Sequence, residues 1–140
     1  MLRGAKIQRG ADLGERMLRA IAEGLRSHRT VILIGSDCPA LTACDLRRAE
    51  RLLNGGCDVV LAPAEDGGYA LIAARRVSRR LFADVPWGGA TVYEETLRRL
   101  EALGWRWRAL RTLWDVDRPE DLERLRALRL SSAMRRSARR

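Results

Sequence analysis

The fold of this chain is set by residues 30–39, whose sequence is Thr30-Val31-Ile32-Leu33-Ile34-Gly35-Ser36-Asp37-Cys38-Pro39. The first half is a short apolar run rich in β-branched residues, which predicts a buried strand rather than a helix. A strand that is apolar on both faces belongs in a sheet that is covered on both sides. In such sheets, ligands bind beyond the carboxyl ends of the strands. Asp37 therefore lies where a functional carboxylate is expected.

Helical and strand patterns alternate along the rest of the chain. Apolar spacing, together with Asp12, Thr42 and Thr91 as N-caps, predicts the elements. We expect helices over residues 12–28, 43–53, 77–82, 91–103 and 119–130, and strands over residues 30–34, 58–63, 69–73 and 105–113. This alternation is typical of an α/β fold with a mainly parallel sheet. The turn between the second and third strands is too short for a right-handed crossover, so one strand should run antiparallel.

Length and composition bound the class of protein. With 140 residues, 46% of them hydrophobic, the chain is predicted to form one globular domain over residues 1–130, followed by a basic disordered tail over residues 131–140. No apolar run approaches the roughly 20 residues that span a bilayer. The first residues lack the apolar core of a signal peptide, so a cytoplasmic location is expected. The three cysteines have no CxxC spacing and are expected to be reduced thiols.

The formal net charge of +9 raises the question of nucleic-acid binding. Much of the excess lies in the arginines of residues 135–140. The interleaved aromatic residues of a single-strand binder are missing, since the chain has two Tyr and one Phe. A solvated basic tail is the preferred interpretation, with weak contact to nucleic acid or to an anionic surface as a further expectation.

Three acidic loops follow apolar strands, namely Ser36-Asp37, Glu65-Asp66 and Asp115-Val116-Asp117. We expect all of them to meet on one edge of the sheet. Carboxylates gathered there suit Mg²⁺ or Mn²⁺, which take oxygen ligands and bridge to substrate phosphates. Aspartate also favours turns because it hydrogen-bonds its own backbone, and for any one loop alone this explanation is preferred. The shared placement of three loops favours a site.

Gly67 and Gly68 follow the second acidic loop. Two glycines there let the backbone approach a ligand closely or adopt a positive φ, although a tight turn between strands explains them equally well. Neither a GxGxxG nor a GxxxxGK[ST] motif is present, which argues against Rossmann and P-loop nucleotide sites. The single histidine, His28, ends a helix, so no Ser-His-Asp triad is expected.

Five motifs occur in order along the chain. They are Gln-Arg-Gly-Ala-Asp-Leu-Gly-Glu-Arg-Met at residues 8–17, Gly-Ser-Asp-Cys-Pro at 35–39, Pro-Ala-Glu-Asp-Gly-Gly-Tyr at 63–69, Pro-Trp at 86–87 and Asp-Val-Asp-Arg-Pro-Glu-Asp-Leu at 115–122. Together they resemble the bacterial GT-A-like glycosyltransferase family of the arsenosugar-biosynthesis type. That family is related to the nucleotidyltransferases that make molybdopterin guanine dinucleotide and activated phospholactate. The resemblance covers about residues 8–125 and implies a three-layer α/β/α nucleotide-diphosphosugar-transferase fold.

The resemblance also implies roles for individual residues. Asp37 takes the place of the acid that holds a divalent metal, Mg²⁺ or Mn²⁺, under the nucleotide diphosphate, and Asp117 resembles a second metal acid. Asp66 is expected on the acceptor side, as a general base or as a residue that orients the acceptor hydroxyl. The candidate substrate-binding residues are Gly35, Ser36, Glu65, Gly67, Gly68, Tyr69 and Trp87.

Members of the family begin with a further strand and a basic, Gly-containing loop that grips the nucleotide phosphates. Residues 1–10 are too few to supply these elements, so we expect a fold that is truncated at its N-terminus, either as a fragment or as a reduced homologue. Gly88 and Gly89 also stand where the family has hydroxyl side chains.

The predicted function is transfer of a sugar from a nucleotide-activated donor to a small-molecule acceptor with a divalent metal. One alternative is a nucleotidyltransferase on the same fold, which releases pyrophosphate from a nucleoside triphosphate instead of a nucleoside diphosphate from a nucleotide sugar. A further alternative is an inactive remnant or a basic nucleic-acid-binding protein. The last predicts binding with a steep salt dependence and no metal-dependent nucleotide affinity.

Overall fold

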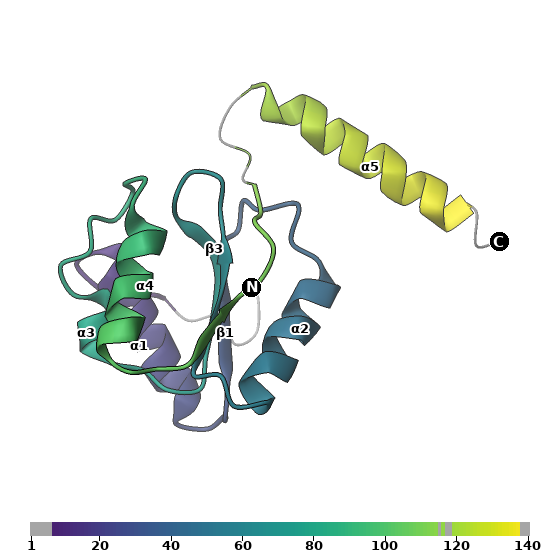
Figure 1. Cartoon of the computed structure of the whole chain (residues 1–140). Coiled ribbons are helices and arrows are strands. Elements are labelled where there is room, and N and C mark those ends of the chain that lie inside the picture. The colour runs from purple at the N-terminus through teal and green to yellow at the C-terminus, as the bar shows by residue number, and fades with distance from the viewer. Residues whose placement is uncertain (1–6, 115, 117–118, 138–140) are drawn as a thin grey trace.

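A computed structural model describes residues 7–114, 116 and 119–137. Within these residues, helices and strands follow one another in the predicted order (Figure 1). The elements are α1 (Leu13–Leu25), β1 (Val31–Ile34), α2 (Ala43–Asn54), β2 (Val59–Pro63), β3 (Tyr69–Ala74), α3 (Arg79–Phe82), α4 (Val92–Ala102), β4 (Trp107–Ala109) and α5 (Asp121–Ser137). No helix in the described part of the chain is long and apolar enough to cross a membrane.

The described strands form one mixed sheet in the order β1-β3-β2-β4. β3 runs antiparallel to both β1 and β2, and β2 runs parallel to β4. The expected antiparallel strand is therefore confirmed as β3. β3 lies between β1 and β2 and runs opposite to both of them, so it makes two antiparallel pairs. The expectation that most strand pairs are parallel is therefore wrong.

β1 lies at the edge of the described sheet, although its apolar sequence predicts a buried strand. Its residues are half-buried, and Ile34 keeps 54% of its surface exposed. The fully buried strands are the central pair, in which Val59 and Leu71 expose at most 1% of their surface. An apolar sequence indicates that a strand belongs to a covered sheet, but it does not tell whether the strand lies at the edge or in the centre of that sheet.

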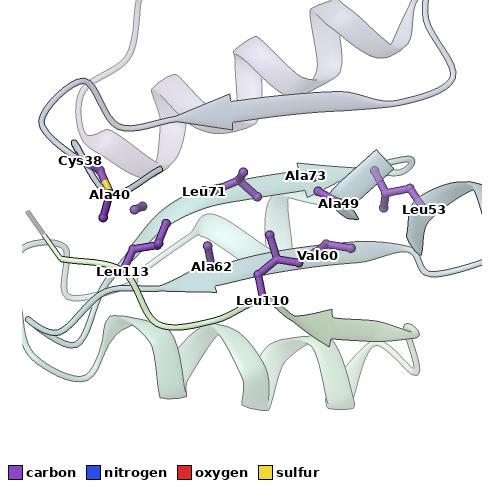
Figure 2. Close-up of a cluster of buried hydrophobic side chains, with 11 residues drawn as sticks. Cys38, Ala40, Ala49, Leu53, Val60, Ala62, Leu71, Ala73, Leu110 and Leu113 are labelled. Carbon is purple, nitrogen blue, oxygen red and sulfur yellow. The ribbon is translucent and has the colours of Figure 1, made fainter. Parts of the chain in front are cut away.

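Helices cover the sheet on both faces (Figure 1). One face of β2, with Val59 and Leu61, packs against α1, α3 and α4 through residues that include Ile21 and Leu100. The alternate residues of the same strands face α2. This second cluster, shown in Figure 2, contains Cys38, Ala40, Ala49, Leu53, Val60, Ala62, Ala70, Leu71, Ala73, Leu110 and Leu113. Alternation along the strands thus supplies two cores, as a sheet between helices requires.

β4 is shorter than the predicted strand over residues 105–113. Beyond Ala109, the chain continues beside β2 without regular pairing: the Leu110 N–H donates to the Leu61 carbonyl at 2.8 Å and the Leu113 N–H donates to the Pro63 carbonyl at 2.7 Å. This irregular segment carries the chain to the carboxyl end of β2.

The predicted caps of α1 and α2 are confirmed. The Asp12 carboxylate accepts from the Glu15 N–H at 2.8 Å, and Thr42 forms a reciprocal capping box with Asp45. Thr91 precedes α4 as predicted, but its side chain makes no capping hydrogen bond. Caps satisfy the free N–H groups of the first helical turn, which explains why such residues mark helix starts.

Asp45 is also a buried anchor for the chain beyond β4. The Arg111 guanidinium donates to both carboxylate oxygens of Asp45, at 2.8 and 3.1 Å, and to the Ala40 carbonyl at 2.7 Å. Burial alone would raise the pKa of Asp45, but the hydrogen bonds from Arg111 and Thr42 outweigh it and hold the pKa below its ordinary value. This pair fastens residue 111 to the start of α2.

α5 follows the sheet as a long helix that points away from the rest of the molecule (Figure 1). It runs to Ser137, past the end near residue 130 that the sequence predicts. The division of the chain at residue 131 stays a prediction. The three cysteines are free thiols, as expected.

Candidate functional site

The carboxyl ends of β1, β2 and β4 share one edge of the sheet, because these strands run in the same direction. The loop after β1 carries Asp37, and the loop after β2 carries Glu65 and Asp66. These two acidic loops therefore lie at the same edge of the sheet, as expected, and whether they form one site stays a prediction. Asp115 and Asp117 of the third loop lie outside the described residues.

The Asp37 loop is joined to the chain that follows β4. The Val116 N–H donates to the Asp37 carbonyl at 3.2 Å, and the Cys38 thiol donates to the Trp114 carbonyl at 3.5 Å. Cys38 and Leu113 lie at the same end of the buried cluster under α2 (Figure 2). The first and third acidic loops are thus held together by their backbones, since Val116 is the central residue of the third loop.

The Asp37 side chain is exposed. Among the described residues, none forms a hydrogen bond or an ion pair with its carboxylate. Gly35 and Ser36, which precede it, are exposed as well. A carboxylate without a structural partner at a strand end is available to an external ligand.

Asp66 closes the turn between β2 and β3. One of its carboxylate oxygens accepts from the Gly68 N–H at 2.9 Å, and the Ala64 N–H donates to the Gly68 carbonyl at 3.0 Å. The side chain is exposed, and only one carboxylate oxygen takes part in the turn. The turn explanation for this aspartate therefore holds, and among the described residues its second oxygen has no hydrogen-bond partner.

Gly67 is required by a close approach between two backbones. Its φ is +91°, and a Cβ at this position would lie 1.9 Å from the Ala90 carbonyl oxygen. The Tyr93 N–H donates to the Gly67 carbonyl at 2.9 Å. The glycine thus fastens the turn to the first residues of α4, and the approached group is part of the protein itself. A role for Gly67 in ligand binding stays a prediction.

Tyr69 and Trp87 point into the core below the edge. Their rings meet edge to face at a centroid distance of 6.5 Å, and Trp87 also stacks on Phe82 at 6.5 Å. The Tyr69 hydroxyl and the Trp87 indole N–H are buried without a hydrogen-bond partner among the described residues. Burial raises the pKa of the Tyr69 hydroxyl. The geometry assigns a packing role to both side chains, and their roles toward a substrate stay predictions.

Glu65 is paired with an arginine that the sequence did not single out. Arg124 of α5 donates to both carboxylate oxygens of Glu65, at 2.9 and 3.0 Å. Its guanidinium carbon lies 4.5 Å from the centroid of the Trp114 ring. The hydrogen bond from Arg124 lowers the pKa of Glu65. No motif marks Arg124, because the contact depends on where α5 leaves the sheet.

The side chains at this edge also bear on metal binding. Within the part of the chain that the structure describes, no three His, Cys, Asp or Glu side chains gather to hold a metal ion. Asp37 offers the oxygen ligand that Mg²⁺ or Mn²⁺ prefers, and the loop bonded to it contains two further carboxylates in its sequence. A metal role for Asp37 and Asp117 therefore stays a prediction.

Comparison with known proteins agrees with this fold. The chain is similar to the crystal structure of a "putative nucleotide-diphospho-sugar transferase" from Desulfovibrio desulfuricans G20, with 34% sequence identity and a TM-score of 0.74. The match covers 79% of this chain and 48% of that one, so the chain spans about half the length of that protein. No curated protein matches. The expected resemblance is confirmed as far as a nucleotide-diphospho-sugar-transferase-like structure.

A family model also matches residues 4–89, which are more than half of the chain. This region contains β1, β2, β3 and the loops with Asp37 and Asp66. The chain therefore belongs to the family described as an uncharacterized protein conserved in bacteria, DUF2064.

Proposed function

We propose that this chain takes part in transferring a sugar from a nucleotide-activated donor to a small-molecule acceptor. The proposal is supported by the similarity to the transferase-like structure. The single observation that carries it is the hydrogen bond between the Val116 N–H and the Asp37 carbonyl. This bond joins two acidic loops at the edge of the sheet where α/β proteins bind their ligands.

In this proposal, Asp37 and Asp117 would hold a Mg²⁺ or Mn²⁺ ion that binds the diphosphate of the donor. When bound, such an ion neutralises negative charge on the leaving diphosphate. The carboxylate of Asp37, which is exposed and has no partner among the described residues, suits that role. Gly35 and Ser36 line the same loop and present backbone and hydroxyl groups to the donor.

The acceptor side is assigned to the turn between β2 and β3. Asp66 uses one carboxylate oxygen to close the turn, which fixes the direction of the other. That second oxygen orients the acceptor hydroxyl or removes its proton. Gly67 and Gly68 keep the turn narrow, and Tyr69 and Trp87 support it from below. The proposed substrate-binding set also includes Glu65.

Direct measurement of binding tests the proposal. Isothermal titration with UDP, GDP, dTDP and ADP, each with and without Mn²⁺, should find at least one nucleoside diphosphate whose binding needs the metal. Asp37→Asn should weaken that binding at least about tenfold, because the variant loses a charged ligand of the ion. Glu101→Gln is the matched control, since it removes one exposed carboxylate at the far end of α4.

The same experiment can contradict the proposal. If no nucleoside diphosphate binds in a metal-dependent way, the proposed function is wrong. If Asp37→Asn and Glu101→Gln bind equally well, the metal role of Asp37 is wrong. With a nucleotide sugar as donor, release of the nucleoside diphosphate supports sugar transfer, whereas release of pyrophosphate from a nucleoside triphosphate supports nucleotidyl transfer instead.

A further inference from the structure

We propose that Arg124 of α5 is a phosphate-binding residue, which exchanges its partner Glu65 for the diphosphate of the donor. This inference rests on the proposed function for the identity of the ligand. It assigns a contact to a residue outside every motif discussed above. Three observations carry it: the position of Arg124 at the acidic edge, the exposure of its ion pair, and the aromatic ring beneath its guanidinium.

The position follows from Trp114, which connects Arg124 to the Asp37 loop. The Trp114 carbonyl accepts the hydrogen bond from the Cys38 thiol, next to Asp37 in the chain. The ring of the same tryptophan lies under the Arg124 guanidinium, at 4.5 Å. Arg124 therefore lies at the same edge as the carboxylate that is proposed to hold the metal.

The ion pair between Arg124 and Glu65 is open to solvent. The Arg124 side chain is 45% exposed and the Glu65 side chain is 55% exposed. Exposed pairs of this kind contribute little to stability, because water screens the charges and both side chains lose freedom. Such a pair is readily exchanged when a ligand with more negative charge arrives.

The geometry of the pair matches phosphate recognition. Arg124 donates to Glu65 through two nitrogen atoms, at 2.9 and 3.0 Å, which is the two-pronged arrangement that guanidinium groups also form with phosphate. Trp114 contacts the face of the guanidinium and keeps its plane oriented after Glu65 is displaced. The charge of Asp121, on the same helix, also acts on Arg124, so the arginine retains one acidic neighbour in either state.

Two titrations of the full chain test the inference. In the first, inorganic pyrophosphate is added without metal, and its binding is followed through the ¹⁵N signal of the Trp114 indole. This signal is assigned by comparison with the Trp114→Phe variant. The nucleoside diphosphate that binds best with Mn²⁺ is followed by calorimetry. Both ligands should bind the native chain, and pyrophosphate should shift the Trp114 signal.

Substitutions of Arg124 and of Glu65 should change pyrophosphate binding in opposite directions. Arg124→Gln should weaken pyrophosphate binding about tenfold, which is the usual effect of removing one charged hydrogen-bond partner. Arg124→Lys should restore part of the affinity, since lysine keeps the charge but not the two-pronged geometry. Glu65→Gln should tighten binding about twofold, because it removes the competing carboxylate. Arg126→Gln, on the same exposed helix, is the matched control and should bind like the native chain.

The remaining outcomes either overturn this inference or separate it from the proposed function. The inference is overturned if pyrophosphate leaves the Trp114 signal of the native chain unchanged. It is also overturned if Arg124→Gln and Arg126→Gln lose pyrophosphate affinity equally, or if Glu65→Gln binds pyrophosphate more weakly. If pyrophosphate binds through Arg124 while no nucleoside diphosphate binds with Mn²⁺, the proposed function fails and the phosphate-binding role of Arg124 stands. If the nucleotide binds equally to the native chain and to Arg124→Gln, the proposed function stands and this inference fails.

Discussion

An acid, an arginine and a tryptophan come together at each end of β2, and the two trios differ in burial. At the amino end, Arg76 lies 3.9 Å from the Asp58 carboxylate and 4.5 Å from the centroid of the Trp105 ring. Asp58 also accepts hydrogen bonds from Arg75 and from the Arg106 N–H, and its side chain is 7% exposed. Here the acid is enclosed and all of its partners belong to the protein.

At the carboxyl end, the trio of Glu65, Arg124 and Trp114 has the same arginine–ring distance of 4.5 Å and a closer ion pair, at 2.9 Å, but it lies in solvent. The Glu65 side chain is 55% exposed, and Arg124 is the partner of both its oxygens. Similar kinds of side chain thus form a buried pair at one end of the strand and a solvent-exposed pair at the other. Burial, not residue type, separates a structural acid from a candidate functional one.

Removing the acid at each end should give the largest contrast in stability. Asp58→Ala leaves the Arg106 N–H and the Arg75 guanidinium without their partner, and should lower the free energy of unfolding by about 3 kcal/mol. Glu65→Ala should leave the urea midpoint close to that of the native chain, because its pair is open to solvent. Urea unfolding followed by circular dichroism measures both. Equal losses in the two variants would remove the distinction between the ends.

The turn at the carboxyl end is predicted to be rigid although its acids are exposed. Gly67→Ala combines a φ of +91° with a Cβ placed 1.9 Å from the Ala90 oxygen, and should destabilise the fold by about 2 kcal/mol. Gly88→Ala is a suitable control, since its φ of +85° meets open space and leaves backbone strain as the only penalty. Thermal unfolding should therefore show a clearly larger loss for Gly67→Ala. A loss no greater than that of Gly88→Ala would mean that the turn yields easily.

Low pH should destabilise the fold at the amino end of β2 through protonation of Asp58. Burial tends to raise the pKa of Asp58, but the hydrogen bonds from the Arg106 N–H and Arg75 dominate and hold the pKa below 3.8. A carboxylate with a lowered pKa stabilises the folded chain above pH 3.8, and this stabilisation is lost as the pH falls further, because the unfolded chain takes up the proton first.

Urea unfolding of the native chain at pH 7 and at pH 3 should show this loss directly. Asp58→Asn should lose less stability between the two pH values, since it has no carboxyl group to protonate at this position. The same loss in both proteins would assign the acid sensitivity to other groups, among which Asp45 also has a lowered pKa.

Local patterns in the sequence predicted most of the elements. The caps at Asp12 and Thr42, the apolar strands and the short turn before Tyr69 each depend on neighbouring residues, so their physical causes are visible in the sequence. The antiparallel direction of β3 followed from the length of one turn. The shared edge of Asp37 and Asp66 was expected because each of them follows an apolar strand.

Features that depend on packing between distant segments were not visible. The edge position of β1, the inward direction of Tyr69 and Trp87, and the contact of Arg124 with Glu65 are set by which elements meet. The apolar sequence of β1 fits an edge and a centre equally well. An arginine on an exposed helix carries no local sign of its partner, since charged residues are common on such faces.

The bond between Val116 and Asp37 also bears on when the site comes into existence. Its two residues are far apart in the chain, and the segment after Leu113 reaches the loop after β1 from β4, which pairs with β2. Contacts of such long range close late, because the intervening chain must first lose its freedom. During synthesis, the loop with Asp37 is therefore made well before its partner, and this edge of the sheet is completed only when the chain has been made past residue 116.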